Sequence, residues 1–119
     1  MQKHILIADD HAAIRQAVKF VLSRTLDVED YDEATNGRDA VAIAEQRKPD
    51  LIILDIGMPQ MDGITAAQHL KQSMPEVPII LFTMHDVAPN RARELGVDAV
   101  VSKTGVAELS NQARSLLSR

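Results

Sequence analysis

Four short, largely apolar runs, each followed at once by a polar or charged residue, constrain the fold of this chain more than any other feature. The runs and the residues that follow them are 5–8 with Asp9 and Asp10, 51–54 with Asp55, 79–82 with Thr83, and 99–102 with Lys103. Apolar runs of this length are typical of strands in a parallel sheet that is covered on both faces. We therefore expect a buried sheet that brings three carboxylates, a hydroxyl and an ammonium to the edge where open α/β sheets bind ligands.

Stretches with helical periodicity separate these runs. An apolar stripe from Ile14 to Leu22 indicates a helix after the first strand, and Asp62-Gly63 opens another. Asp86 is expected to cap a short helix that holds Pro89 in its first turn. The remaining expected elements are a weaker strand at 28–34, a helix at 37–47 and a last helix whose apolar face runs from 106 to 117.

This alternation predicts an α/β, doubly wound fold of the (βα)5 type with a five-stranded parallel sheet. Because crossovers between parallel strands are right-handed, the chain must lay strands on both sides of the first, most simply in the order 2-1-3-4-5. A length of 119 residues suits one domain, so we expect residues 1–119 to form a single domain whose last helix ends at Arg119.

Composition narrows the class of protein. The chain has no cysteine, which excludes disulfides and thiolate metal sites, and no segment resembles a signal peptide or a membrane span. We therefore expect a cytoplasmic protein. A formal net charge of −4 argues against broad nucleic-acid binding by this chain itself. The acidic residues at 27–33 are expected to lie on a solvated, charge-protected edge strand.

Charge predicts the chemistry of the sheet edge. At the switch point between the first and third strands, Asp9, Asp10 and Asp55 would crowd into one cleft and repel one another unless a cation intervenes. Oxygen ligands of this kind are those that Mg²⁺ prefers. The alternative is that Asp9 and Asp10 cap the first helix, and we favour a metal site in which one of them serves both roles.

Thr83 and Lys103 indicate what such a metal site would serve. A hydroxyl and an ammonium that face a metal-bound carboxylate form a pocket for a tetrahedral anion. Asp55 would then attack phosphorus and form an acyl phosphate, with catalysis supplied by positioning and charge neutralisation. Taken singly, Lys103 would be a salt-bridge partner of Asp55 and Thr83 a β-branched strand residue, but the combination favours a phosphoryl site.

These residues closely resemble the defining set of the receiver domains of two-component response regulators, and the resemblance covers essentially the whole chain. The segment 55–63 is similar to the family's D-x-x-M-P-x-M-D-G loop. The resemblance implies a flavodoxin-like receiver fold. It also implies roles for three residues: Asp55 as phosphoacceptor, Thr83 as switch hydroxyl and Lys103 as the family's lysine.

The same resemblance implies a Mg²⁺ site. Its expected ligands are Asp10, Asp55 and the backbone carbonyl of Gly57, with Asp9 acting through water. The Asp-Asp-His sequence after the first strand and the Lys103-Thr104 pair are more similar to the LuxR/NarL-type subgroup, whose receivers precede a helix-turn-helix DNA-binding domain. We expect that output domain to be absent from this chain.

Three positions depart from the common pattern of the family. Val100 stands where many receivers carry an aromatic residue whose rotation reports phosphorylation, so that switch element is not expected here. Thr104 replaces a proline that often follows a cis bond, which predicts a trans bond or a differently shaped loop. Met84 stands where a small residue is common and would narrow access to a phosphoryl group. His11 and His85 are expected to flank the cleft. Steering of the water that removes the phosphoryl group is one hypothesis for His85, and a solvated loop histidine is the commoner alternative.

The implied function is a phosphorylation-dependent signalling switch that catalyses only its own phosphotransfer and dephosphorylation. A sensor histidine kinase or a phosphotransfer protein would phosphorylate Asp55, and the surface of the fourth helix, fifth strand and fifth helix would change to control an output, expected to be transcription. Homodimerisation on phosphorylation is a further expectation, DNA would be contacted only through an output domain, and no membrane contact is expected. A phosphorylation-independent interaction domain is the alternative left open.

Overall fold

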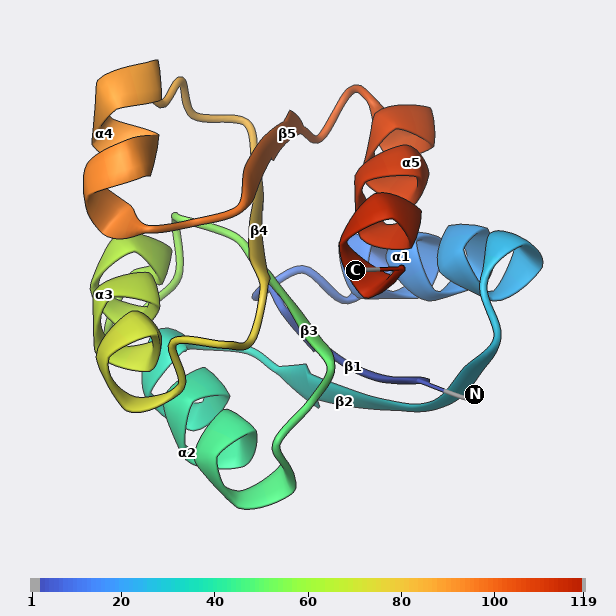
Figure 1. The fold of residues 1–119 in the computed structure, drawn as a ribbon, viewed down its shortest axis with the longest axis horizontal. Helices are drawn as coiled ribbons and strands as arrows, with labels where there is room; N and C mark the ends of the chain where they lie inside the picture. Colours follow the sequence, from blue (N-terminus) through green and yellow to red (C-terminus); the bar gives the residue numbers. More distant parts are fainter. Residues whose placement is uncertain (1–2, 119) are drawn as a thin grey trace.

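In the computed structural model, which describes residues 3–118, five strands and five helices alternate along the chain (Figure 1). They are β1 (Lys3–Ala8), α1 (Ala12–Thr25), β2 (Val28–Ala34), α2 (Gly37–Arg47), β3 (Leu51–Leu54), α3 (Gly63–Ser73), β4 (Ile79–Thr83), α4 (Pro89–Leu95), β5 (Ala99–Ser102) and α5 (Val106–Leu117). Met1 and Arg119, the expected ends of the domain, lie outside the described residues. Among the residues described, no helix has the length and apolar character needed to cross a membrane.

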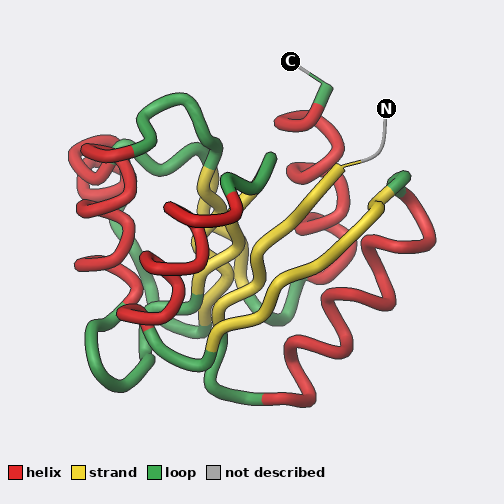
Figure 2. The backbone as a smooth tube through the Cα atoms, turned by 90° about the horizontal axis from the view of Figure 1, so that it is seen from below, coloured by secondary structure: helices red, strands yellow, loops and turns green. Residues whose placement is uncertain are grey.

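The strands form one parallel sheet in the order β2-β1-β3-β4-β5, which confirms the predicted topology. Alternate residues of the central strands pack on opposite faces of this sheet. Leu6 and Ile52 face the layer of α2, α3 and α4, whereas Ile5 and Ile53 face α1 and α5 (Figure 2). Helices cover both faces of the sheet, so side chains on both faces of these strands are buried. This explains why the strands are continuous apolar runs in the sequence.

Local signals explain the starts of two helices. Asp62 caps α3 by accepting a hydrogen bond from the N–H of Thr65 at 2.8 Å. Asn36 caps α2 in the same way, with the N–H of Asp39 at 2.8 Å. Both caps satisfy amide groups that the first helical turn leaves without a partner.

The short helix α4 starts differently from the prediction. Pro89 lies in its first turn as expected, and the helix stops at Gly96, whose φ is 75°. The predicted cap by Asp86 is wrong, because Ala88 is the N-cap residue and no side chain caps this helix. Pro89 carries no N–H and its fixed φ suits a first turn, which lowers the need for a side-chain cap.

The acidic strand β2 lies at the sheet edge as predicted, but its carboxylates have basic partners. Arg47 of α2 binds Asp30 at 2.7 Å and Asp32 at 3.1 Å. His4 of β1 is largely buried, with its Nε2 2.6 Å from Oδ2 of Asp32. Two basic side chains of α1 bind Glu33. Ion pairs therefore connect this edge strand to α1, α2 and β1, in addition to its backbone pairing with β1.

Candidate functional site

The polar residues that follow the strands meet at one edge of the sheet, as predicted. Strands β1 and β3 run in register, with Ala8 opposite Leu54, so they end at the same level. The N–H of Asp55 donates to the carbonyl of Ala8 at 2.9 Å, which places Asp55 beside Asp9. One ligand atom from each of four residues lies within 4.8 Å of the others: Asp9, Asp10, His11 and Asp55.

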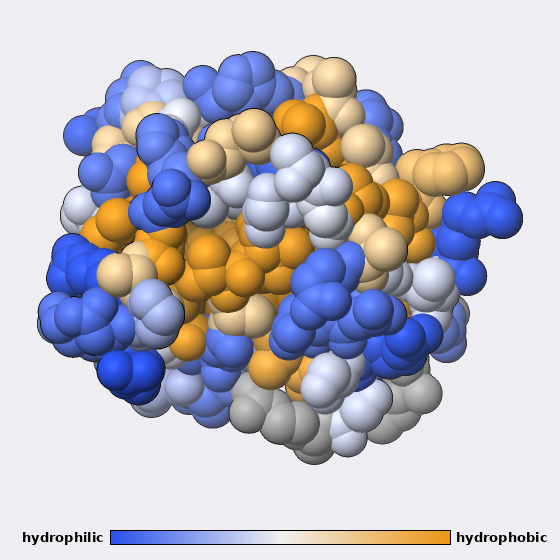
Figure 3. Space-filling view, turned by 90° about the horizontal axis from the view of Figure 1, so that it is seen from above, coloured by the Kyte–Doolittle hydropathy of each residue, from blue (hydrophilic) through white to orange (hydrophobic). Residues whose placement is uncertain are grey.

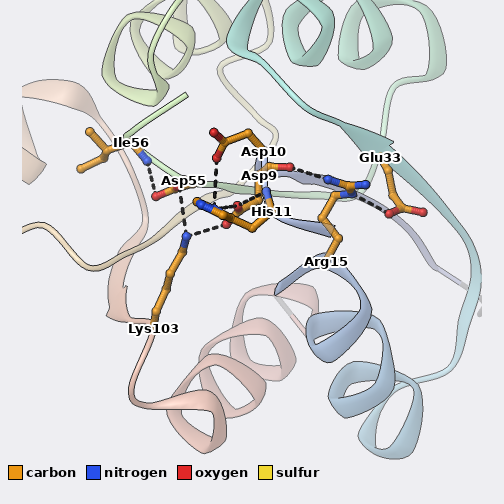
Figure 4. A network of polar contacts seen from close by, with 8 residues as sticks. All are labelled: Asp9, Asp10, His11, Arg15, Glu33, Asp55, Ile56 and Lys103. Atoms are coloured by element: carbon orange, nitrogen blue, oxygen red, sulfur yellow. Dashed lines mark hydrogen bonds and ion pairs between the residues drawn. The ribbon is translucent and has the colours of Figure 1, made fainter. Parts of the chain in front are cut away.

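Lys103 reaches this cluster from the loop after β5 (Figure 4). Its Nζ lies 2.6 Å from Oδ2 of Asp9 and 3.1 Å from Oδ2 of Asp55, and the three side chains are at most 8% exposed. Burial by itself lowers the pKa of Lys103, but hydrogen bonds and charges from Asp9 and Asp55 outweigh it and raise the pKa above its ordinary value. Lys103 is therefore a permanent ammonium between two buried carboxylates.

His11 lies on the solvent side of the acidic pair. Its backbone N–H donates to Oδ1 of Asp9 at 2.9 Å, and its ring Nδ1 lies 3.0 Å from that oxygen and 3.1 Å from Oδ1 of Asp10. His11 is itself the N-cap residue of α1, without a capping side-chain hydrogen bond. The prediction that Asp9 or Asp10 also caps α1 is therefore wrong, although Oδ1 of Asp9 accepts the N–H of the N-cap residue itself.

Thr83 ends β4 and is 1% exposed. Its hydroxyl oxygen accepts the backbone N–H of His85 at 3.0 Å, so the side chain is tied to the segment between β4 and α4. Its carbonyl accepts the N–H of Lys103 at 3.1 Å. Thr83 thus connects the start of that segment with the loop that carries the ammonium.

The loop after β3 is shaped by close backbone approaches. A Cβ at Gly63 would lie 1.9 Å from the carbonyl oxygen of Asp55, so α3 begins directly against the backbone of that aspartate. A Cβ at Gly57 would lie 3.2 Å from Nε2 of His85, which places the His85 ring over this loop at the cleft, as expected. Oδ1 of Asp55 accepts the N–H of Ile56 at 2.8 Å. That the Gly57 carbonyl binds a metal stays a prediction.

Comparison with known proteins identifies the family. Residues 5–114 match the response regulator receiver domain. The chain belongs to the response regulator receiver domain family. It is 35% identical over 102 residues to the response regulator protein VraR of Staphylococcus aureus, an alignment that covers 84% of this chain and 49% of the relative. The chain therefore spans about half the length of the curated relatives it matches.

Solved structures agree with this family and favour its LuxR/NarL-type members. A LuxR-family two-component response regulator from Aurantimonas sp. SI85-9A1 superposes with a TM-score of 0.90 at 26% identity, covering 99% of this chain and 86% of that chain. A LuxR-family DNA-binding response regulator from Staphylococcus aureus superposes with a TM-score of 0.87 at 28% identity, covering 97% and 98%. The response regulator domain of Thermotoga maritima CheB, at 23% identity and a TM-score of 0.88 over 100% and 98%, shows the same fold.

The departures of this receiver from the common pattern have structural outcomes. Val100 is 37% exposed on the edge strand β5, and Met84 is 67% exposed, so most of the Met84 side chain lies in solvent. Among residues 3–118 no peptide bond is cis, which confirms the predicted trans bond at Lys103-Thr104. Ser102 holds this loop instead, since its hydroxyl oxygen accepts the N–H of Thr104 at 3.2 Å.

Sequence reasoning missed Arg15 of this receiver. Its Nη1 donates to the carbonyl of Asp9 at 2.8 Å and its Nε donates to Glu33 at 2.8 Å (Figure 4). The positions of the two residues could have predicted this contact. Arg15 lies in the first turn of the helix that follows the acidic pair, and Glu33 lies at the carboxyl end of the strand beside β1.

Proposed function

We propose that this receiver is a cytoplasmic phosphorylation switch in which Asp55 accepts a phosphoryl group from a sensor histidine kinase or a phosphotransfer protein. The observation that carries the proposal is the ammonium of Lys103, 3.1 Å from Oδ2 of Asp55 in a buried pocket. At that distance it can bind an oxygen of a phosphoryl group attached to Asp55. An Asp55 carboxylate oxygen forms the new O–P bond, the P–N bond to the donor histidine breaks, and the imidazole leaves with the donor.

The donor set of the pocket suits Mg²⁺. One ammonium cannot neutralise three carboxylates, so the cluster keeps an excess of negative charge that a hard divalent cation relieves. The proposed ligands are Asp10, Asp55 and the carbonyl of Gly57, with Asp9 acting through water. Bound there, Mg²⁺ would supply the positive charge that lets an anionic phosphoryl group approach a carboxylate.

The proposed signal is a change of surface. Phosphorylation replaces a carboxylate by a dianionic group, which draws Lys103 and the hydroxyl of Thr83 toward the new oxygens. Because that hydroxyl holds the N–H of His85, its movement would shift the segment between β4 and α4. Apolar side chains gather on the face that carries α4, β5 and α5 (Figure 3), and Val100 is exposed there on β5. We propose that this face binds partners, a second copy of the chain included, with an affinity that depends on phosphorylation.

The proposed output is transcription. One structural relative is described as a DNA-binding response regulator of the LuxR family, which supports an output through a DNA-binding domain. Within this proposal residues 1–119 form one receiver domain, which catalyses only its own phosphotransfer and dephosphorylation. Its chemistry stops at the acyl phosphate of Asp55, and any contact with DNA is made by an output domain.

The test is phosphorylation by a small-molecule phosphodonor with Mg²⁺, followed by intact-protein mass spectrometry. Wild type should gain one phosphoryl group and Asp55→Asn none. Asp62→Asn is the matched control, because it makes the same change at an exposed aspartate and asparagine also caps helices well. Labelling of Asp55→Asn to the wild-type level would overturn the proposal.

A second experiment separates a switch from a constitutive interaction domain. Beryllofluoride with Mg²⁺ mimics the phosphoryl group, and backbone amide shifts report where the protein responds. A switch should show shifts at Thr83 and along β5 around Val100, together with a changed tendency to dimerise. A response confined to residues next to Asp55, with unchanged self-association, would favour the phosphorylation-independent alternative.

A further inference from the structure

We propose that Arg15 is a positioning residue that fixes the backbone of Asp9 and so sets the affinity of the acidic pocket for Mg²⁺. The inference rests on the proposed function, because it concerns the same metal site. It adds a residue outside the expected set of ligands and reacting groups.

The contacts of Arg15 join the pocket to the edge strand. Its side chain is 15% exposed and lies between the start of α1 and the end of β2. Nη1 donates to the carbonyl of Asp9 at 2.8 Å, and Nε donates to Oε1 of Glu33 at 2.8 Å. One planar guanidinium therefore holds a backbone carbonyl and a carboxylate at the same time (Figure 4).

This contact completes the anchoring of Asp9. Its N–H donates to the carbonyl of Ala34 at 3.0 Å, and its own carbonyl accepts Arg15. Because a peptide unit is planar, holding that carbonyl also fixes the amide of Asp10. The side chain of Asp9 also holds the loop on its solvent side, because its Oδ1 accepts the N–H of His11, whereas Arg15 is the side chain that binds the Asp9 carbonyl. Arg15 therefore helps to fix the backbone from which both acidic side chains leave.

Glu33 orients the guanidinium. It is opposite Ile7 in the register of β1 and β2, close to the end of the strand that delivers Asp9. Lys19 also binds Glu33, with Nζ 2.9 Å from Oε2. Two hydrogen bonds, the larger effect from Lys19 and the smaller from Arg15, lower the pKa of Glu33, so it remains a carboxylate at neutral pH. The guanidinium is thus held from one side by a fixed charge and aimed at Asp9 on the other.

The physical consequence is preorganisation of the metal ligands. Partners that orient ligands from outside a metal site typically change metal affinity by about tenfold or more when they are removed. A lysine at position 15 keeps the positive charge but replaces a planar fork, whose Nη1 and Nε point at the Asp9 carbonyl and at Glu33 from fixed positions, by one mobile nitrogen, so it fixes the two groups less rigidly. Arg15→Lys therefore separates geometry from charge.

The experiment is a Mg²⁺ titration of the whole chain, followed by backbone amide shifts, with urea unfolding measured on the same proteins. Arg15→Lys should bind Mg²⁺ about tenfold more weakly than wild type. Arg47→Lys is the matched control, because Arg47 also binds carboxylates of β2, at Asp30 and Asp32, and should leave the affinity unchanged. Glu33→Gln, which releases the guanidinium without touching Arg15, should weaken binding in the same direction and replaces Arg15→Lys if that variant does not fold.

The outcomes distinguish the inference from the function on which it rests. Wild-type affinity in folded Arg15→Lys or Glu33→Gln, while wild type itself binds Mg²⁺, would overturn the positioning role and leave the metal site intact. Equal weakening by Arg47→Lys would also overturn it, since the effect would then follow stability. Failure of wild type to bind Mg²⁺ at millimolar concentrations would overturn the metal site and the inference together.

Discussion

The ammonium of Lys103 lies closer to Asp9 than to the proposed phosphoacceptor: Nζ is 2.6 Å from Oδ2 of Asp9 and 3.1 Å from Oδ2 of Asp55. One charge thus joins the ends of β1, β3 and β5. New oxygens on Asp55 would draw Lys103 away from Asp9, whose buried carboxylate then needs another positive charge. The proposed phosphorylation and metal binding would therefore be coupled through the contact between Lys103 and Asp9.

Replacement of Lys103 by methionine should make folding depend on Mg²⁺. Without divalent cations, Lys103→Met leaves Asp9 and Asp55 buried together without a countercharge, and we expect a loss of about 3 kcal/mol in the free energy of unfolding. Mg²⁺ should restore part of this loss because it supplies the missing positive charge. Urea unfolding with a chelator and with Mg²⁺ measures both quantities.

Lys71→Met is the control for this prediction. Lys71 is also largely buried and paired, with Nζ 3.0 Å from Asp98 and 2.9 Å from the carbonyl of Val77, but it lies outside the acidic pocket. Its replacement should destabilise the protein without any recovery by Mg²⁺. The same recovery in both variants would contradict the role given to Lys103.

The two glycines that follow β3, Gly57 and Gly63, should differ in how much stability is lost when each is replaced by alanine. Gly63→Ala forces a Cβ to within 1.9 Å of the Asp55 carbonyl oxygen, so backbone must move, and we expect a loss of about 3 kcal/mol. Gly57→Ala meets only the far end of the His85 ring at 3.2 Å and should change the free energy of unfolding by no more than about 1 kcal/mol. Urea unfolding of both variants checks the contrast, which fails if their losses are equal.

The sequence predicted the topology because the relevant signals are local. Buried strands such as 51–54 are continuous apolar runs, and a polar residue of the pocket, here Asp55, follows the run directly. Once the strand order follows from right-handed crossovers, Asp9 and Asp55 must be neighbours. The pocket could therefore be assembled from the printed sequence without any knowledge of side-chain contacts.

The details that sequence reasoning missed depend on how the chain leaves each strand. Whether Asp9 or His11 becomes the N-cap of α1 is decided by the backbone turn after β1, which has no sequence signature here. Arg15 and Glu33 are 18 residues apart in the sequence, and their hydrogen bond forms only because β2 lies beside β1. The contact of Lys103 with both Asp9 and Asp55 likewise depends on how the ends of β1, β3 and β5 are aligned along the sheet edge.

The Glu33 network should make stability depend on pH in the acidic range. The pKa of Glu33 is lowered in the folded protein, mainly by the hydrogen bond from Lys19 and secondly by the one from Arg15. Its contribution is complete above the ordinary glutamate pKa and is lost as the pH falls through the lowered value. Glu33→Gln should therefore flatten the fall of the unfolding free energy in that window, and Lys19→Gln should flatten it partly. An unchanged slope in Glu33→Gln, measured by urea unfolding at a series of pH values, would argue against this network.

Removal of the Thr83 hydroxyl should uncouple the phosphoryl site from the segment that follows β4. Thr83→Ala loses the acceptor for the N–H of His85, with a cost of about 1 kcal/mol, while Asp55 and Lys103 keep their contact. Phosphorylation of Asp55 should therefore persist, whereas the amide shifts that beryllofluoride causes between β4 and α4 should largely disappear. Thr83→Ser keeps the hydroxyl and should retain them. If Thr83→Ala responds as fully as Thr83→Ser, movement of this segment does not depend on the hydroxyl, and the signal must reach α4 through the Thr83 carbonyl and the loop of Lys103 instead.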